Sequence, residues 1–404
     1  MCRIISVDFS DKVPLDVSST FTILVPALAA YFAGAVLAIL PRTVLLRRAL
    51  LPLTLWCALR VGVRLDVSFG NPAKAHANQS LALFMFMIAM RSISWTISRE
   101  NLKPIPGTAV DSKSSEASRG MLLSNACDLA LGVRELDWQG PRKAKSIAQA
   151  RPAQSRHSFL TNSSLSIVRH LLLADVFVLA VQSFSPTTIG TPDGDSIFDP
   201  SLPPAQRYLR STAISLFFGS ALYCMTQAVY DAISVIGVAV LGQRPDQWPP
   251  IFHSPWRSTS LRELWGDRWH HLNRRYMIIL GAKPMYRLAG YPGGILGAFA
   301  LSGLFHDFGL RAVGRGSDLI VFGFFFMMGV GVILESLWTR SMRTAVAGAF
   351  GWIWTFGWVA LWGNGLVDAW VRRGAAAAAI FPEPFRPSKL ALSLIVYFTN
   401  LSVR

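Results

Sequence analysis

Long apolar stretches, separated by polar segments, run through most of the chain. In order they are Phe21–Leu40, Leu50–Val63, Ser80–Ile97, Leu165–Phe184, Ser211–Leu241, Gly293–Gly309, Asp318–Glu335, Val346–Leu361 and Leu390–Val403. A helix that crosses a bilayer needs about 20 mainly apolar residues, whereas a membrane strand needs about 10 residues of alternating polarity. The pattern therefore predicts an all-α polytopic membrane protein with about eight or nine transmembrane helices.

Composition supports the same class. Of the 404 residues, 52% are hydrophobic and 15% are charged, whereas soluble domains carry about 25% charged residues. The four cysteines lie far apart in sequence and form no CxxC pair, so we expect neither a disulfide framework nor a zinc site.

The polar segments differ in charge. Segments 42–48, 98–164 and 242–287 are basic, and segment 185–206 has three Asp and no Lys or Arg. Cytosolic loops of membrane proteins are rich in Lys and Arg, so the basic segments are predicted to face the cytosol. The chain has 39 Lys and Arg against 23 Asp and Glu, but no nucleic-acid motif accompanies them. The bilayer, and not nucleic acid, is the expected partner.

This charge pattern divides the chain into three parts. Residues 1–97 are predicted to form the N-terminal transmembrane helices, and 98–164 a basic cytosolic loop that is partly disordered near Asp111–Arg119. Residues 165–404 are predicted to form a larger transmembrane region, which carries the candidate catalytic residues.

Several ionisable residues lie inside apolar stretches, among them Arg60, Arg91 and Asp175. A charge at the centre of a transmembrane helix costs about 2.5–3.5 kcal/mol on insertion scales, so such residues mark functional sites by default. For Arg91 we favour snorkelling toward the interface over pairing inside the membrane. In a transporter these residues would line a pathway, and this class stays open at this point.

Two short pieces concentrate the candidate chemistry. Residues 261–275 contain two Trp, the adjacent His270 and His271, and four Arg, and residues 301–309 place His306 inside an apolar stretch. A neutral imidazole suits a general base near pH 7. A nearby polar group such as His270 could orient a substrate or stabilise an oxyanion. The alternative for His306 is a structural histidine that hydrogen-bonds within the core.

Other chemistries find less support. The four arginines of the first piece could bind phosphates, although ordinary cytosolic charge explains each one as well. Membrane di-iron oxygenases need repeated histidine boxes, which this chain with its seven His lacks, so no metal is expected. The chain has no GxSxG elbow, Walker loop or dinucleotide fingerprint.

At these two pieces the sequence resembles the wax-synthase-like branch of the membrane-bound O-acyltransferase superfamily. That branch carries S-L-x-x-F-W-G-R-R-W-[NH], which here reads SLRELWGDRWH over residues 260–270. It also has an S-G-L-x-H segment, which here is Ser302 to His306, and fungal members often have W-P-P-[LI]-F upstream, as at 248–252. The chain departs from the pattern at Leu264 and at Asp267, which replaces the first Arg.

The resemblance implies acyl transfer from acyl-CoA to a hydroxyl, with no bound cofactor. It implies that His306 is the catalytic base and His270 the second catalytic residue. The expected substrate- and CoA-binding residues are Trp265, Arg268, Trp269, His271, Arg274, Arg275 and Ser302. Fungal relatives suggest acetyl-CoA and a terpenoid alcohol, and long-chain wax ester synthesis is the alternative. The endoplasmic reticulum is the expected location. The sequence predicts neither the oligomeric state nor the topology after the sixth span.

Overall fold

The structure of the protein is a computed structural model that describes residues 11–98, 101–104, 119–132, 138–139 and 154–402. Within these ranges the chain is mainly helical, and its strands are limited to two short pairs. β1 (Val13–Pro14) pairs in parallel with β2 (Leu65–Asp66), and β3 (Lys103–Pro104) pairs antiparallel with β4 (Trp138–Gln139). The predicted all-α class is confirmed. Of the stretch predicted to be disordered, residues 111–118 lie outside the described residues.

Six helical stretches are long and apolar enough to cross a membrane. They are Val17–Ile39, Pro72–Ile97, Arg156–Ser183, Pro204–Ala239, Arg274–Arg311 and Leu319–Met342. Three further predicted spans also coincide with helices, namely α3 (Val44–Arg64), α12 (Gly348–Val371) and α13 (Pro387–Ser402). The predicted number of crossings stays a prediction, and so does the three-part division of the chain.

The chain forms two compact units. The first comprises residues 1–70, 75–150 and 253–351, as far as they are described. Its N-terminal helices are α1 (Val17–Ser19), a π-helical turn (Thr20–Leu24), α2 (Val25–Ile39), α3, α4 (His76–Ile97) and α5 (Arg119–Leu131). Tyr31 and Trp95 stack at 5.2 Å between ring centroids in the core that α2, α3 and α4 share.

Arg91 does not snorkel, and that expectation was wrong. Its side chain is 1% exposed. The guanidinium donates to the backbone oxygens of Leu129 (2.5 Å), Ala130 (3.2 Å) and Gly132 (3.0 Å), at the C-terminus of α5. It also lies over the Tyr31 and Trp95 rings. The carbonyl end of a helix attracts cations, so Arg91 caps α5 from inside the unit.

The predicted span Gly293–Gly309 is one arm of a helical hairpin. α9 (Arg274–Tyr276) continues through a π-helical segment (Met277–Ala282) into α10 (Lys283–Arg311), which is interrupted at Ala289 and at Gly290 with φ +60°. A Cβ on Gly281 would lie 2.5 Å from the backbone oxygen of Gly297, so the chain folds back at this break. Residues 277–288 therefore pack antiparallel against 291–302.

We expect Gly281→Ala to destabilise this hairpin. The added methyl group has no room unless the two arms separate, and overpacking of this kind typically costs about 1–3 kcal/mol. The thermal unfolding midpoint of the detergent-purified protein would measure the loss. Gly323→Ala is the matched control, because nothing lies within 4 Å of its added methyl. Equal midpoints for the two variants would contradict the close packing of the arms.

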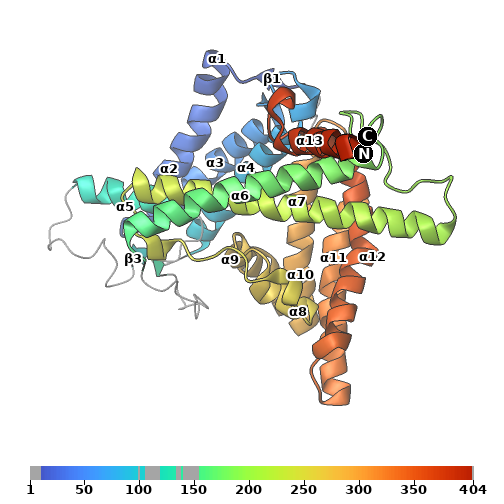
Figure 1. Ribbon diagram of the computed structural model, residues 1–404. Helices are drawn as coiled ribbons and strands as arrows, with labels where there is room; N and C mark the ends of the chain where they lie inside the picture. The colour runs from blue at the N-terminus through green and yellow to red at the C-terminus, as the bar shows by residue number, and fades with distance from the viewer. Residues whose placement is uncertain (1–10, 99–100, 105–118, 133–137, 140–153, 403–404) are drawn as a thin grey trace, which may run out of the picture. The chain divides into compact units, whose positions relative to one another are not determined.

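α11 (Leu319–Met342) returns along the second arm of the hairpin, and Figure 1 shows α10 and α11 side by side. Glycines permit the close approach. A Cβ on Gly303 would lie 2.9 Å from the Phe322 ring, and one on Gly329 would lie 3.1 Å from the Phe299 ring. This pair of helices forms one wall of the candidate site.

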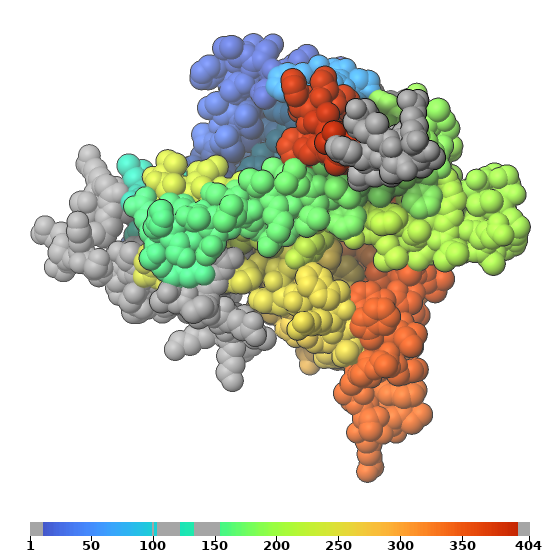
Figure 2. All heavy atoms as spheres, in the orientation of Figure 1, coloured from blue at the N-terminus to red at the C-terminus, as the bar shows by residue number. Residues whose placement is uncertain are grey.

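The second unit comprises residues 71–74, 151–252 and 352–404, as far as they are described. Its two longest helices, α6 (Arg156–Ser183) and α7 (Pro204–Ala239), run along each other (Figure 1) and present a continuous surface in Figure 2. Residues 352–371 of α12 and all of α13 belong to this unit.

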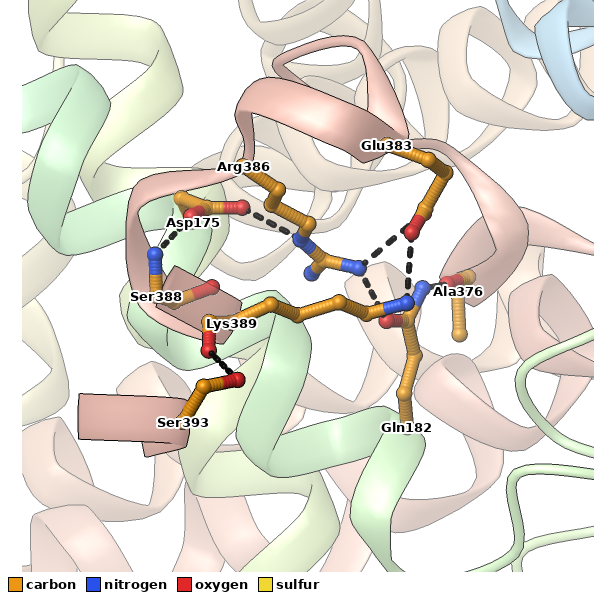
Figure 3. A network of polar contacts seen from close by, with 8 residues as sticks. All are labelled: Asp175, Gln182, Ala376, Glu383, Arg386, Ser388, Lys389 and Ser393. Atoms are coloured by element: carbon orange, nitrogen blue, oxygen red, sulfur yellow. Dashed lines mark hydrogen bonds and ion pairs between the residues drawn. The ribbon is translucent and has the colours of Figure 1, made fainter. Parts of the chain in front are cut away.

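Asp175 in α6 forms a buried ion pair with Arg386 (Figure 3). The Arg386 Nε lies 2.7 Å from Asp175 Oδ1, and both side chains are 0% exposed. Asp175 Oδ2 also accepts the Ser388 N–H at 2.9 Å, and Gln182 Oε1 accepts from Arg386 at 2.7 Å. These contacts hold the N-terminal end of α13 against α6. The Asp175 carboxylate therefore has a structural role, and a transporter pathway is not needed to explain it.

Asp175→Asn should destabilise the second unit strongly. Removing one partner of a buried ion pair leaves an uncompensated charge and typically costs about 3–5 kcal/mol. Glu383→Gln is the control, because Glu383 also contacts Arg386 but its side chain is 55% exposed. Surface pairs contribute about 0–1 kcal/mol. Chemical denaturation in detergent would compare the variants, and similar losses for both would refute the role of burial.

Candidate active site

Residues 260–270, called the motif segment below, pack lengthwise against α10 and α11. It begins at α8 (Leu261–Glu263), where the Ser260 hydroxyl accepts the Glu263 N–H at 3.0 Å as an N-cap. Glu335 of α11 accepts the backbone N–H groups of Leu261 (2.5 Å) and Arg262 (3.0 Å). Glu335 is 4% exposed, so a buried carboxylate compensates the positive end of this short helix.

The Arg262 side chain contacts both α10 and α11 at the same end as Glu335. Its guanidinium donates to the Tyr291 hydroxyl and, at 2.8 Å, to the Ser336 hydroxyl. Tyr291 opens the second arm of the hairpin and Ser336 lies near the end of α11. The motif segment therefore starts beside the tip of the hairpin.

From there the π-helical turn Leu264–Arg268 leads away from the tip between aromatic side chains. The Trp265 ring meets Phe299 of α10 at 6.3 Å and Phe324 of α11 at 6.2 Å between centroids. Trp269 packs edge-on against Trp265 at 6.0 Å. Aromatic contacts of this kind fix the position of the two residues that follow, His270 and His271.

His306 lies at the far end of this aromatic wall. Its ring stacks on Phe325 at 4.2 Å with an interplanar angle of 19°, and Phe305 packs edge-on against it at 5.1 Å. Nδ1 lies 2.8 Å from the Ser302 backbone oxygen. A carbonyl oxygen only accepts hydrogen bonds, so this contact assigns the proton of the neutral ring to Nδ1 and leaves the lone pair on Nε2.

His270 comes close enough to His306 and His271 for their charges to influence it. It lies outside the candidate membrane spans. Burial, followed by repulsion from these two imidazoles, lowers the pKa of His270 to about 3. The ring is therefore neutral at physiological pH, and it can act through hydrogen bonds but supplies no fixed positive charge.

Arg268 is engaged inside the segment. Its guanidinium pairs with Glu263 at 2.6 Å and donates to the backbone oxygen of His253 at 3.0 Å. Burial tends to raise the pKa of Glu263, but hydrogen bonds from Thr259 and the Arg268 guanidinium outweigh it and lower that pKa. The pair fixes the fold of the motif. Asp267, where the chain departs from the family pattern, is exposed.

The other expected binding residues have different surroundings. His271 faces His253 at 6.1 Å between ring centroids. Arg274 is exposed and Arg275 is half-buried at the start of α9. Ser302 acts on His306 through its backbone oxygen. Their roles toward CoA stay predictions. The described part of the chain holds no group of three or more His, Cys, Asp or Glu that could bind a metal.

Two neighbours of the site were missed by sequence reasoning. Phe325 sits in a Phe-rich stretch, where nothing distinguishes it from its neighbours. Glu335 offered a signal, because an acidic residue at the end of an apolar stretch is costly and needs a partner. Its partner, the N-terminus of α8, lies more than seventy positions away, as the separation of 74 residues to Leu261 shows.

Fold and site together define an all-α integral membrane protein in which a motif segment brings a histidine beside an intramembrane histidine. Residues 248–327 match the Membrane bound O-acyl transferase family. This range contains the Trp-rich motif, the hairpin and His306. The resemblance predicted from the two motifs is confirmed.

Curated relatives point the same way. Acetyltransferase aurG of Calcarisporium arbuscula is 26% identical over 56% of this chain and 60% of its own length. O-Mevalon transferase yanI of Aspergillus niger is 23% identical over 84% of this chain and 82% of its own length. A long-chain-alcohol O-fatty-acyltransferase of Simmondsia chinensis is 29% identical over 42% of this chain and 52% of its own length. The chain thus spans about three fifths of aurG.

Proposed function

We propose that the protein is an O-acyltransferase that moves an acyl group from acyl-CoA to the hydroxyl of a lipophilic alcohol. The observation that carries the proposal is the nearness of His270, in the motif segment, to the candidate base His306. The His306 Nδ1–H donates to the Ser302 backbone oxygen, so Nε2 is the atom that can accept a proton. The names of the relatives, which are acetyltransferases and a fatty-acyltransferase, support the same reaction class.

In the proposed reaction, Nε2 of His306 removes the hydroxyl proton while the alcohol oxygen attacks the thioester carbonyl carbon. The tetrahedral intermediate then collapses, its C–S bond breaks, and the CoA thiolate takes the proton from His306. His270 contributes as a neutral hydrogen-bonding group that positions a reactant or the oxyanion. A thioester is already activated, so the mechanism needs no acyl-enzyme. Phe325 and Phe305 fix the plane of the His306 ring.

The favoured donor is acetyl-CoA and the favoured acceptor is a terpenoid alcohol. Support comes from the several relatives whose names contain acetyltransferase. The Simmondsia relative supports the alternative of a long-chain acyl group and a fatty alcohol. We also propose that the protein resides in the endoplasmic reticulum, the default location for enzymes of this kind.

A transporter would be the alternative from a different class. Its pathway would use the charges at Arg60, Arg91 and Asp175. Arg91 and Asp175 already have structural partners, and Arg60 donates to the Thr22 backbone oxygen at 3.2 Å. These contacts favour the enzyme.

Microsomes that contain the protein provide the test. They would receive radiolabelled acetyl-CoA or palmitoyl-CoA together with mixed terpenoid and fatty alcohols. We expect labelled ester from acetyl-CoA and a terpenoid alcohol. Label only from palmitoyl-CoA on fatty alcohols would establish wax ester synthesis instead. If a folded, membrane-inserted protein forms no ester with any pairing, the acyltransferase proposal fails.

A further inference from the structure

Asp307 directly follows the candidate base His306 on α10, and the proposed reaction does not use it. The residue is only 9% exposed. Consecutive residues of a helix point about 100° apart, so the carboxylate of Asp307 and the ring of His306 meet different neighbours. A buried carboxylate is costly unless it is paired, and its contacts therefore indicate what it does.

The Asp307 carboxylate joins the end of α10 to the start of α11. Oδ2 accepts from Nε of Arg311 at 3.0 Å, one turn later in the same helix. Oδ1 accepts the backbone N–H of Asp318 at 3.2 Å. Asp318 is the N-cap residue of α11, so this second contact connects two helices across a separation of 11 positions in the sequence.

The connection between the two helices contains two glycines in the left-handed region. Gly314 has φ +89° and Gly316 has φ +75°, conformations that glycine adopts without steric cost. Asp318 then caps α11, because its carboxylate accepts the Ile320 N–H at 3.2 Å. A short connection with two glycines leaves the start of α11 free to shift along α10. The hydrogen bond from the Asp318 N–H to Asp307 restricts this shift.

The first turns of α11 carry the aromatic ring that stacks on His306. Phe325 lies seven residues after Asp318, or about two turns of helix, and its ring centroid is 4.2 Å from that of His306. The adjacent Phe324 contacts Trp265 of the motif segment at 6.2 Å. A slip of α11 by one residue would move both rings by about 1.5 Å and turn them by about 100°. The stacking on His306 therefore depends on where α11 begins.

An ordinary helix-stabilising role explains only one of the two contacts. Acidic and basic residues four positions apart pair on many helix surfaces, and the Asp307–Arg311 pair would form without α11. The bond to the Asp318 N–H has a different consequence, because it sets the register between α10 and α11. The two contacts can be separated by experiment, since Arg311 can be replaced without a change at Oδ1.

We propose that Asp307 is a positioning residue that acts on His306 through the register of α11 and the Phe325 ring. The inference rests on the proposed function, in which His306 is the base. By holding the start of α11, Asp307 keeps the Phe325 ring nearly parallel to the imidazole, and this ring fixes the plane in which Nε2 meets the substrate hydroxyl. Loss of the register should slow proton transfer and lower kcat, and it should leave KM nearly unchanged.

The test compares kcat and KM of three purified full-length variants, well below their unfolding midpoints. Asp307→Ala removes both contacts and should lower kcat at least about tenfold, with KM within about threefold of the wild type. Asp307→Asn keeps an oxygen that can accept the Asp318 N–H, so it should recover most of kcat. Arg311→Gln removes only the contact within α10 and is the matched control, with kcat close to that of the wild type. Equal losses in the Arg311→Gln and Asp307→Ala variants, or no recovery with Asn, would overturn the proposal.

A double-mutant cycle tests whether Asp307 acts through Phe325. Phe325→Leu removes the stacked ring and should lower kcat about as much as Asp307→Ala does. Residues that act through one another have non-additive effects. Adding Asp307→Ala to Phe325→Leu should therefore lower kcat by less than a further factor of about three. Two losses that multiply in full would show that Asp307 acts elsewhere, and the proposal would be wrong.

Backbone hydrogen exchange separates this inference from the proposed function. Asp307→Ala should speed amide exchange between Leu319 and Phe325 by at least about tenfold, and Arg311→Gln should not, because local exchange reports how firmly a segment is held. Unchanged exchange in the Ala variant would refute the link to α11 whatever the activity. An inactive wild type would refute the proposed function together with this inference. An active wild type with an equally active Asp307→Ala variant would refute the inference alone.

Discussion

His306→Gln is expected to lower the rate of acyl transfer by about 10²–10⁴-fold, the usual contribution of a general base. Glutamine keeps a polar group of similar size, and its amide can still donate to the Ser302 oxygen. It has no atom that takes up a proton at neutral pH. The measurement is ester formation by microsomes at saturating acyl-CoA, normalised to the amount of inserted protein.

The chain offers a matched control in α6. His170 is also buried, and its Nδ1 lies 2.8 Å from the backbone oxygen of Ser166, four residues earlier. It thus repeats the local arrangement of His306 but lies outside the motif segment. His170→Gln should leave turnover within a few-fold of the wild type. Retained turnover in the His306 variant, or equal loss in both, would remove His306 from the mechanism.

The second large effect is expected at Glu335. We infer that Glu335 is a positioning residue, because its carboxylate holds the N-terminus of the segment that carries Trp265 and His270. Glu335→Ala leaves the backbone N–H groups of Leu261 and Arg262 buried without their acceptor. The segment then shifts, and a displacement of about 1 Å at the reacting groups can cost up to about 10²-fold in rate. We expect this loss mainly in kcat.

A conservative variant distinguishes positioning from general destabilisation. Glu335→Asp keeps the negative charge on a shorter side chain, so it should recover part of kcat. Leu334→Ala is the control at an adjacent position, because the Leu334 side chain is exposed, and it should reduce kcat only slightly. The measurements are kcat and KM of purified protein at a temperature well below the unfolding midpoint. If the Asp variant is as inactive as the Ala variant while both are folded, the positioning role is refuted.

From the sequence we predicted the helical class, and we proposed that His306 and the Trp265–His270 motif belong to one site. Both predictions rest on strong local signals. Apolar stretches long enough to cross a bilayer are unmistakable, and a histidine inside one of them stands out because polar groups there are costly. The motif spacing then linked the two pieces through a family resemblance.

Contacts between residues far apart in sequence could not be predicted in this way. Arg91 looked like a snorkelling residue because its acceptors belong to α5, a helix in the basic segment after the third apolar stretch. The hairpin was also missed. A helical pattern continues on both sides of Gly290, and only the close contact of Gly281 with Gly297 reveals that the chain reverses there.

That reversal changes how membrane crossings are counted. Arg262 lies beside Tyr291, His270 near His306, and Gly281 against Gly297. The stretch from 261 to 288 therefore runs from the hairpin tip to its open end and back again, and we expect it to add no crossing. We therefore expect one crossing for the second arm of α10 and one for α11.

The basic side chains lie at both ends of this helical group. Arg262, Arg340 and Arg343 come to the end at the hairpin tip, whereas Arg274, Arg275, Arg311 and Arg315 belong to the other end, so charge alone assigns neither end to the cytosol. His306 lies fifteen residues along the second arm from Tyr291, or about 22 Å of helix. Under the proposed function, a CoA thioester whose nucleotide binds at the Arg262 end would have to extend its pantetheine arm over nearly that whole distance to reach His306.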